Sequence, residues 1–394
     1  MPNLDVFHRS QYANDLAEQS LHPTPLFQNV RSGVFLSGIR RVGKTTFLRQ
    51  DLIPALEARG AIVVYVDLWA DRLKSPAALV RDAVRDTLVQ LATPGSRLLQ
   101  RFKGLNLGAA SFSFGFQIDS VGAPGGTTLA QAFSELVAKA KSDVVLIVDE
   151  VQQTLSSDDG YGLLHALKAA RDAVNSTPGT AGHFLFLGTG SHKSLVTDMA
   201  TRRSQPFTGA VSAAYEVLGS DFVRWQLDRI SAASASARLP GIDIAFEGFR
   251  AMGHRPEELF KALVQLQSMS LPPDEAFPVI CATLASAAAD VELNAIEEFG
   301  DLGKAIFRRI ALGSEQGVTG LFSADALADY GAQAGVQVEA TQVQTVADKM
   351  IAANLVTRPG HGVYMVADPF VRNVWLQQER LTLPIAVVPP SSEA

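Results

Sequence analysis

An octapeptide near the N-terminus places two glycines, a lysine and a threonine at the spacing of a phosphate-binding loop. Residues 38–45 read Gly-Ile-Arg-Arg-Val-Gly-Lys-Thr and match the pattern G-x-x-x-x-G-K-[ST]. Glycines let the backbone turn tightly, so that successive N–H groups and the start of the following helix face an anion. We expect Lys44 to reach the β- and γ-phosphate oxygens of ATP, and the Thr45 hydroxyl to bind Mg²⁺. The predicted nucleotide-binding residues are Gly38, Ile39, Arg40, Arg41, Val42, Gly43, Lys44, Thr45 and Thr46.

The segments on either side of the loop are those that phosphate binding requires. An apolar run at 34–38 predicts a short buried strand, and the residues after the loop predict a helix that ends at Gly60. The alternative is a glycine-rich turn with a solvated lysine, which needs neither neighbour. The strand, loop and helix together favour nucleotide binding.

A second buried run, at 143–150, ends in the acidic pair Asp149 and Glu150. We expect Asp149 to hold the Mg²⁺ and Glu150 to accept a proton from an attacking water, as in P-loop enzymes that hydrolyse ATP. The alternative is a solvated acidic pair in a loop. One strand–helix unit, beginning at 61–69, separates the pair from the loop, which is consistent with an extra strand between the two motif strands. This places the chain among the hydrolytic ATPases and not the small GTPases.

A third apolar run, at 183–190, is followed by short hydroxyl side chains. Thr189 is the first choice for a catalytic contact to the γ-phosphate or the water, and Ser191 is the second; a turn that favours small polar residues is the alternative. Arg202 and Arg203 come after the next helix. A solvated face is the favoured interpretation of these arginines, and a transition-state charge donated to a neighbouring subunit is the alternative.

Arg255 precedes Pro256 at the start of a predicted helix. It either contacts the nucleotide or is a plain surface arginine.

Composition excludes several classes of protein. The chain has 394 residues, 47% of them hydrophobic and 19% charged, which indicates a globular protein of two or three domains. A net charge of −6 gives no chain-wide reason to coat nucleic acid or an anionic membrane. Cys281 is the only cysteine, so we expect a buried helix residue and no disulfide. The polar, acidic N-terminus and the lack of an apolar run near about 18 residues predict a cytoplasmic protein.

The pattern of apolar runs predicts an α/β fold with a P-loop parallel sheet, followed by a helical lid and a winged helix. Alternating aromatics at 111–119 predict a β excursion on the surface. Buried strands are expected at 34–38, 61–69, 143–150, 183–190 and 213–219, with helices between them. The expected divisions are an N-terminal helical arm at 1–28, the ATPase core at 29–220, the lid at 221–297, the winged helix at 298–378 and a disordered tail at 379–394.

Taken together, these segments resemble the prokaryotic archaeal-type ATPases, P-loop proteins allied to the AAA+ and STAND groups. The resemblance covers about residues 28–378 and rests on SGIRRVGKTTFL, VVLIVDEVQ, GTGS, GHRP and LVTRPGHGVYMVADPFVRNVW. It implies an AAA-like core with a lid and a winged helix. It also implies the roles given above for Lys44, Thr45, Asp149, Glu150, and Thr189 or Ser191.

Two departures from the family affect the expected activity. Relatives commonly carry Gly-Arg shortly after the Thr189 segment, whereas this chain has Gly209 followed by Ala210. An arginine donor at this position is therefore missing, and we expect slow hydrolysis by the protein alone. Many relatives also continue into a nuclease-like domain, and none is expected in this chain.

These observations favour an ATPase switch, in which nucleotide binding closes the lid and winged helix against the core. The alternative is a nucleotide-regulated DNA- or protein-binding module with negligible turnover. A small-substrate kinase is disfavoured because Glu150 suits water as the nucleophile. The expected partners are a protein or a second copy of the chain, contacted through the lid and winged helix, with weak DNA binding and no membrane.

The first prediction concerns DNA. Residues 301–380 carry seven lysines and arginines against eight acids, although phosphate neutralisation normally supplies much of the affinity for DNA. The isolated winged-helix region should therefore bind duplex DNA weakly at physiological salt, and binding should disappear steeply as salt rises. A fluorescence anisotropy titration measures this. A nanomolar, sequence-selective complex would restore a DNA-reading function.

Overall fold

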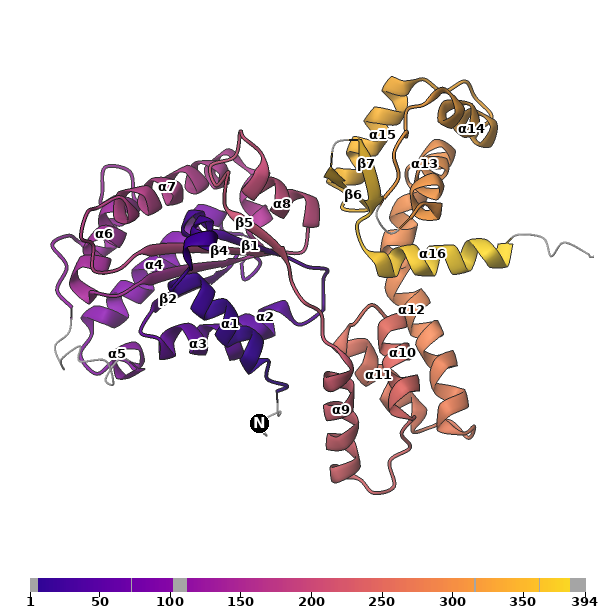
Figure 1. The fold of residues 1–394 in the computed structure, drawn as a ribbon, viewed down its shortest axis with the longest axis horizontal. Coiled ribbons are helices and arrows are strands. Elements are labelled where there is room, and N and C mark those ends of the chain that lie inside the picture. The colour runs from indigo at the N-terminus through magenta and orange to yellow at the C-terminus, as the bar shows by residue number, and fades with distance from the viewer. Residues whose placement is uncertain (1–5, 72, 102–111, 315–316, 361, 383–394) are drawn as a thin grey trace, which may run out of the picture. The chain divides into compact units, whose positions relative to one another are not determined.

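The computed structural model describes residues 6–71, 73–101, 112–314, 317–360 and 362–382. The chain divides into two compact units, Met1–Val217 and Leu218–Ala394 (Figure 1). The first unit is an α/β layer structure and the second is mainly helical.

The first unit is built on a five-stranded parallel sheet in the order β2-β3-β4-β1-β5. The first four predicted strands are confirmed. The fifth begins earlier than predicted, and it is not buried because it lies at an edge, paired only with β1. The strands are β1 (Val34–Ser37), β2 (Ile62–Asp67), β3 (Val144–Asp149), β4 (Phe184–Gly190) and β5 (Val211–Ala214).

The strand order brings the loop and the acidic pair to the same edge of the sheet, with one strand between them. An extra strand does lie between β1 and β3, as predicted, but it is β4. The unit that separates the two motifs in the chain, β2, lies instead at the far edge beside β3. The strand that carries Thr189 is therefore inserted between the loop and Asp149.

Helices cover both faces of the sheet (Figure 1). Alternate strand residues point to opposite faces, as the two-residue period of a strand requires: Phe35 and Val64 belong to one core cluster, Leu36 and Val63 to the other. One face packs against α4 (Pro76–Ala92), α6 (Leu129–Ala140), α7 (Asp158–Asn175) and α8 (Lys193–Thr201). The other packs against α1 (Ser10–Leu21) and the helical run α2 (Lys44–Phe47), η2 (Leu48–Leu52) and α3 (Ile53–Ala58). The short helices are η1 (Pro25–Ser32), α5 (Arg97–Arg101), η4 (Ile118–Ser120) and η5 (Val151–Ser156).

The predicted β excursion at 111–119 is wrong for the residues that the structure describes, 112–119. These form no strand, and the segment ends in η4. Their alternating apolar side chains pack on the core beside α4 and α6, and the rings of Phe114 and Phe116 stack with centroids 5.4 Å apart. The two-residue pattern thus reflects packing of one apolar face and no pairing with a neighbouring strand.

The second unit begins with four helices and continues as three helices, a hairpin and a last helix, the winged-helix arrangement that the sequence predicts. A bridge between Val318 and Tyr364 extends the hairpin. Residues 379–382 of the predicted disordered tail are helical, and 383–394 lie outside the described residues. The elements are α9 (Ser220–Ala233), α10 (Ile242–Ala251), α11 (Pro256–Leu266), α12 (Pro273–Glu297), α13 (Gly300–Leu312), α14 (Ala324–Ala334), α15 (Ala340–Ala352), β6 (Val356–Gly360), β7 (Val363–Val366) and α16 (Pro369–Thr382). In the described part of the chain, no helix has the length and apolar character that crossing a membrane requires.

Cys281 lies on α12 with 1% of its surface exposed, which confirms the predicted core position. Burial raises the pKa of its thiol to about 12. Since the thiolate is the reactive form, alkylation of the native protein at pH 8 should be at least about 10³-fold slower than that of a free thiol. Iodoacetamide labelling followed by mass spectrometry measures the rate, and the protein unfolded in urea is the control. Native labelling as fast as unfolded labelling would contradict the buried position.

Candidate functional site

The loop between β1 and α2 has the backbone conformation that its glycines permit. Gly43 has φ +91° and caps the N-terminus of α2, so a side chain there would be strained. At Gly38 a Cβ atom would lie 2.9 Å from the Cβ of Tyr215, and the Gly38 amide donates to the Gly190 carbonyl on β4 at 3.0 Å. The loop is thus fixed to the ends of neighbouring strands.

Lys44 is folded into the loop. Its ammonium donates to the carbonyl oxygens of Gly38 at 2.6 Å and Ile39 at 2.7 Å, and only 6% of the residue is exposed. Burial lowers the pKa of Lys44; Glu150 and Asp149 oppose this shift and Arg40 adds to it. An ammonium has three donors, so these two bonds leave one for a ligand.

Asp149, at the end of β3, receives hydrogen bonds from three other elements and from the residue that follows it. Its Oδ2 accepts from the hydroxyls of Thr45 at 2.6 Å and Tyr65 at 3.3 Å, and its Oδ1 accepts from the Thr189 hydroxyl and, at 3.1 Å, from the Glu150 amide. Only 1% of Asp149 is exposed. The structure therefore brings together three predicted site residues, Thr45, Asp149 and Thr189.

Tyr65 on β2 is a site residue that the sequence analysis missed. Its pKa is raised, mainly by burial and next by the charge of Asp149, so the phenol stays a donor. The Arg49 guanidinium lies 4.9 Å from its ring centroid. The available signal was a hydroxyl-bearing side chain inside the otherwise apolar run at 62–66.

Glu150 contacts Ser191, the second candidate for a catalytic hydroxyl. Its backbone has φ +57°, and its Oε2 accepts from the Ser191 hydroxyl at 2.8 Å and the Ser191 amide at 3.2 Å. Oε2 also accepts from the Gln152 amide group at 2.5 Å. Gln152 lies on η5, directly after the acidic pair, and is the second site residue that was missed.

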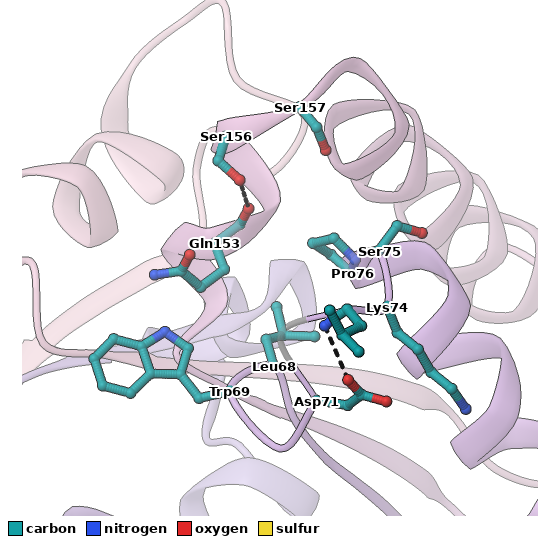
Figure 2. Close-up of a pocket in the computed structure, with 10 residues that line it drawn as sticks. Leu68, Trp69, Asp71, Lys74, Ser75, Pro76, Gln153, Ser156 and Ser157 are labelled. Carbon is teal, nitrogen blue, oxygen red and sulfur yellow. Dashed lines mark hydrogen bonds between the residues drawn. The ribbon is translucent and has the colours of Figure 1, made fainter.

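Arg40 links this group to a neighbouring cavity. Its Nε donates to the Ser191 hydroxyl at 3.3 Å, and its guanidinium lies 5.0 Å from the ring centroid of Trp69. Figure 2 shows Trp69 beside Gln153 at one side of a cavity of about 590 Å³, between the segment after β2 and η5. The lining residues are Leu68, Trp69, Asp71, Leu73, Lys74, Ser75, Pro76, Gln153, Ser156 and Ser157.

The remaining loop residues differ in exposure. Arg41 and Thr46 are exposed, and Val42 is buried in the core beneath the loop, so its side chain faces away from the ligand side. Arg202 and Arg203 are also exposed, as a solvated face predicts, and Arg202 lies 3.6 Å from Asp198.

Ala210 and Arg255, two positions that the sequence analysis considered for an arginine contact, are buried. Ala210, at the position where the resemblance implies an arginine, packs in the sheet core and is 8% exposed. Arg255 in the second unit is 3% exposed and pairs with Asp368 at 3.0 Å, with its guanidinium 4.1 Å from the Phe370 ring centroid. The interpretation of Arg255 as a surface arginine is therefore wrong, because the side chain is buried in the second unit and its charge is paired with Asp368. Contact of Arg255 with nucleotide, the other alternative, is untested.

Thr45 and Asp149 offer hydroxyl and carboxylate oxygens, the ligand type that Mg²⁺ prefers. Within the described ranges, no cluster of three or more His, Cys, Asp or Glu residues is placed to hold a metal ion. Any ion at this site would depend on ligand oxygens or water for its other contacts.

Comparison with known proteins gives similarity of fold. No protein-family model matches the sequence, and no curated protein matches it. A Walker-type ATPase of Pyrococcus abyssi aligns with 94% of this chain and 96% of its own, with 20% identity and a TM-score of 0.58. The ORC2 protein of Aeropyrum pernix in its ADP form aligns over 96% of both chains with 14% identity and a TM-score of 0.53. The ADPNP–ADP complexes of that protein give 16% identity, 96% of both chains and a TM-score of 0.50. The chain has the AAA+, ORC-like fold of these proteins.

Proposed function

We propose that the protein is an ATP-binding and ATP-hydrolysing switch of the AAA+ and STAND-like class. The observation that carries this proposal is the meeting of Thr45 from the loop, Thr189 from β4 and the buried Asp149 carboxylate beside Lys44. A plain glycine-rich turn needs no such convergence. The Walker-type fold and the ADP-bound relative support an adenine nucleotide as the ligand.

The loop fits a phosphate group. The left-handed Gly43 turns the chain into α2, where unpaired amides and the helix dipole favour an anion. Lys44 is already desolvated and retains one donor, so it would bind the β- and γ-phosphate oxygens with little reorganisation. The predicted nucleotide contacts are residues 38–46.

The metal site fits Mg²⁺. Thr45 and Asp149 would hold the ion through their oxygens, which lie 2.6 Å apart, and no histidine or cysteine is needed. When bound, the ion would neutralise charge on the phosphates. Thr189, hydrogen-bonded to Asp149, would keep this carboxylate oriented and contact the γ-phosphate or the water.

Glu150 is the proposed base. A bond forms from the water oxygen to the γ-phosphorus, the bond from that phosphorus to its bridging oxygen breaks, and the water proton passes to Glu150. Three donors converge on Oε2, and no described residue donates a hydrogen bond to Oε1. Oε1 is therefore the atom we assign to the water.

The switch would couple the nucleotide to a rearrangement of a lid at 221–297 and a winged helix at 298–378, with the core at 29–220. The partner would be a protein or a second copy, contacted through these parts, and DNA would bind weakly. Cytoplasmic location stays a prediction. A binding module with negligible turnover is the second candidate, favoured by the buried Ala210 at the arginine position.

Replacing the loop lysine tests the nucleotide site. Lys44→Ala should weaken ATP binding by at least about 10-fold, because charge-assisted hydrogen bonds contribute about 1.5–3 kcal/mol. Titration calorimetry measures the affinity, and Lys168→Ala on α7 is the control. Unchanged affinity together with unchanged turnover would refute the phosphate-loop assignment.

Replacing the proposed base separates hydrolysis from binding. Glu150→Gln should retain ATP affinity but lower turnover by about 10²-fold or more, since a base contributes at least that much and the shape is preserved. Phosphate release and calorimetry on the same samples measure both quantities. Hydrolysis at the wild-type rate would show that another group is the base.

The missing arginine predicts slow hydrolysis by the isolated chain, about one ATP per minute or less, because such an arginine contributes about 10³–10⁵-fold elsewhere. Turnover per site should be measured over a range of protein concentrations, with Arg202→Ala and Arg203→Ala in parallel. A rate that rises with concentration and falls in one variant would identify the donor. Fast turnover that is independent of concentration and survives both substitutions would show that no such arginine is needed.

A further inference from the structure

One oxygen of Glu150 is held more firmly than its role as a base requires. Oε2 accepts from the Ser191 hydroxyl, the Ser191 amide and the Gln152 amide group, whereas Oε1 accepts from none of the residues that the structure describes. Three donors that converge on one oxygen restrict rotation of the carboxylate group, so they also restrict the direction in which Oε1 points.

Gln152 is itself fixed. It is 6% exposed, and a Cβ atom on Gly190 would lie 2.1 Å from its Oε1 and 2.6 Å from Val196. Its Oε1 is buried and has no hydrogen-bond partner among the described residues, which lowers the stability of the folded state. Turning the amide round would aim that oxygen at the Glu150 carboxylate, and two acceptors would repel. The NH₂ group is therefore directed at Glu150, and the glycine leaves room for the side chain in this position.

The Ser191 hydroxyl connects Glu150 to the loop. It donates to Glu150 Oε2 and accepts from Arg40 Nε at 3.3 Å. Arg40 and Lys44 belong to the same loop, so this loop carries two cations where the phosphate is expected. A phosphate anion would attract both, and Arg40 would exchange its long hydrogen bond to Ser191 for a charged one.

We propose that Ser191 and Gln152 are positioning residues that orient Glu150 toward the attacking water, and that Arg40 transmits phosphate binding to them. This inference rests on the proposed ATPase function. The hydrogen bonds run from the loop through Ser191 to Glu150 with no gap, and Trp69, stacked against Arg40, gives a spectroscopic signal of its first step.

Two variants of the full chain test the positioning role. Gln152→Met keeps the size of the side chain and removes its donor, and Ser191→Ala removes one hydroxyl. Each should lower kcat by about 10- to 100-fold with KM and ATP affinity unchanged, since misplacing a reacting group by about 1 Å can cost about 10²-fold. Gln153→Met, on the same turn but facing the cavity, is the matched control and should retain kcat.

The outcomes separate this inference from the function on which it rests. A wild-type or raised kcat in Gln152→Met and Ser191→Ala, while Glu150→Gln loses activity, would overturn the positioning role alone. Full activity in Glu150→Gln would instead overturn the proposed function. A loss of kcat in Gln153→Met equal to that in Gln152→Met would mean that disturbance of the turn, and no specific donor, is responsible.

Tryptophan emission tests the role of Arg40. Subtracting the emission of Trp69→Phe isolates the signal of Trp69, which should change when ADPNP binds because the guanidinium moves from the ring. Arg40→Met should abolish this change and lower kcat by about 10-fold or more, while calorimetry still detects ADPNP. ADPNP binding without a change in Trp69 emission would overturn the transmission by Arg40.

Discussion

The site depends on one buried carboxylate. Asp149 is almost fully enclosed, and a charge removed from water must be compensated by donors close to it. The donors are hydroxyls from α2, β2 and β4 and the next backbone amide. Satisfying this charge therefore fixes the relative positions of three strands and the loop helix. The same constraint places Glu150 beside Ser191. Glu150 directly follows Asp149, and Ser191 lies two residues after Thr189, which donates to Asp149.

The sequence predicted the parts of the site that a linear pattern encodes. The glycine and lysine spacing identified the loop, and the apolar run before Asp149 identified its strand. Tyr65 and Gln152 were missed because their roles arise from the strand order, which brings β2 beside β3 and β4 between β3 and β1. Nothing in the local sequence of Gln152 shows that Gly190, 38 residues later in the chain, leaves room for its side chain.

The fold, like the site, was predicted where a local sequence pattern encodes it. Strands buried on both faces were predicted because short, continuous apolar runs are typical of the central strands of a covered parallel sheet. The bounds and exposure of the edge strand β5 and the packing of the aromatic segment 112–119 were not predicted correctly, because an alternating or short pattern does not distinguish pairing from packing. Arg255 shows the limit for charged residues. Its burial depends on Asp368 and Phe370, which lie more than 100 residues away and supply the opposite charge and the aromatic face.

The central claim is that the Thr45–Asp149 group binds the metal of an ATP complex. Its most direct test is an ATP titration of the full chain with Mg²⁺ and with a chelator, repeated for Thr45→Val, which keeps the side-chain shape and removes the hydroxyl. We predict tighter ATP binding with Mg²⁺ in the wild-type chain and loss of that advantage in the variant. Equal affinity with and without Mg²⁺ in the wild-type chain, or no ATP binding, would contradict the account.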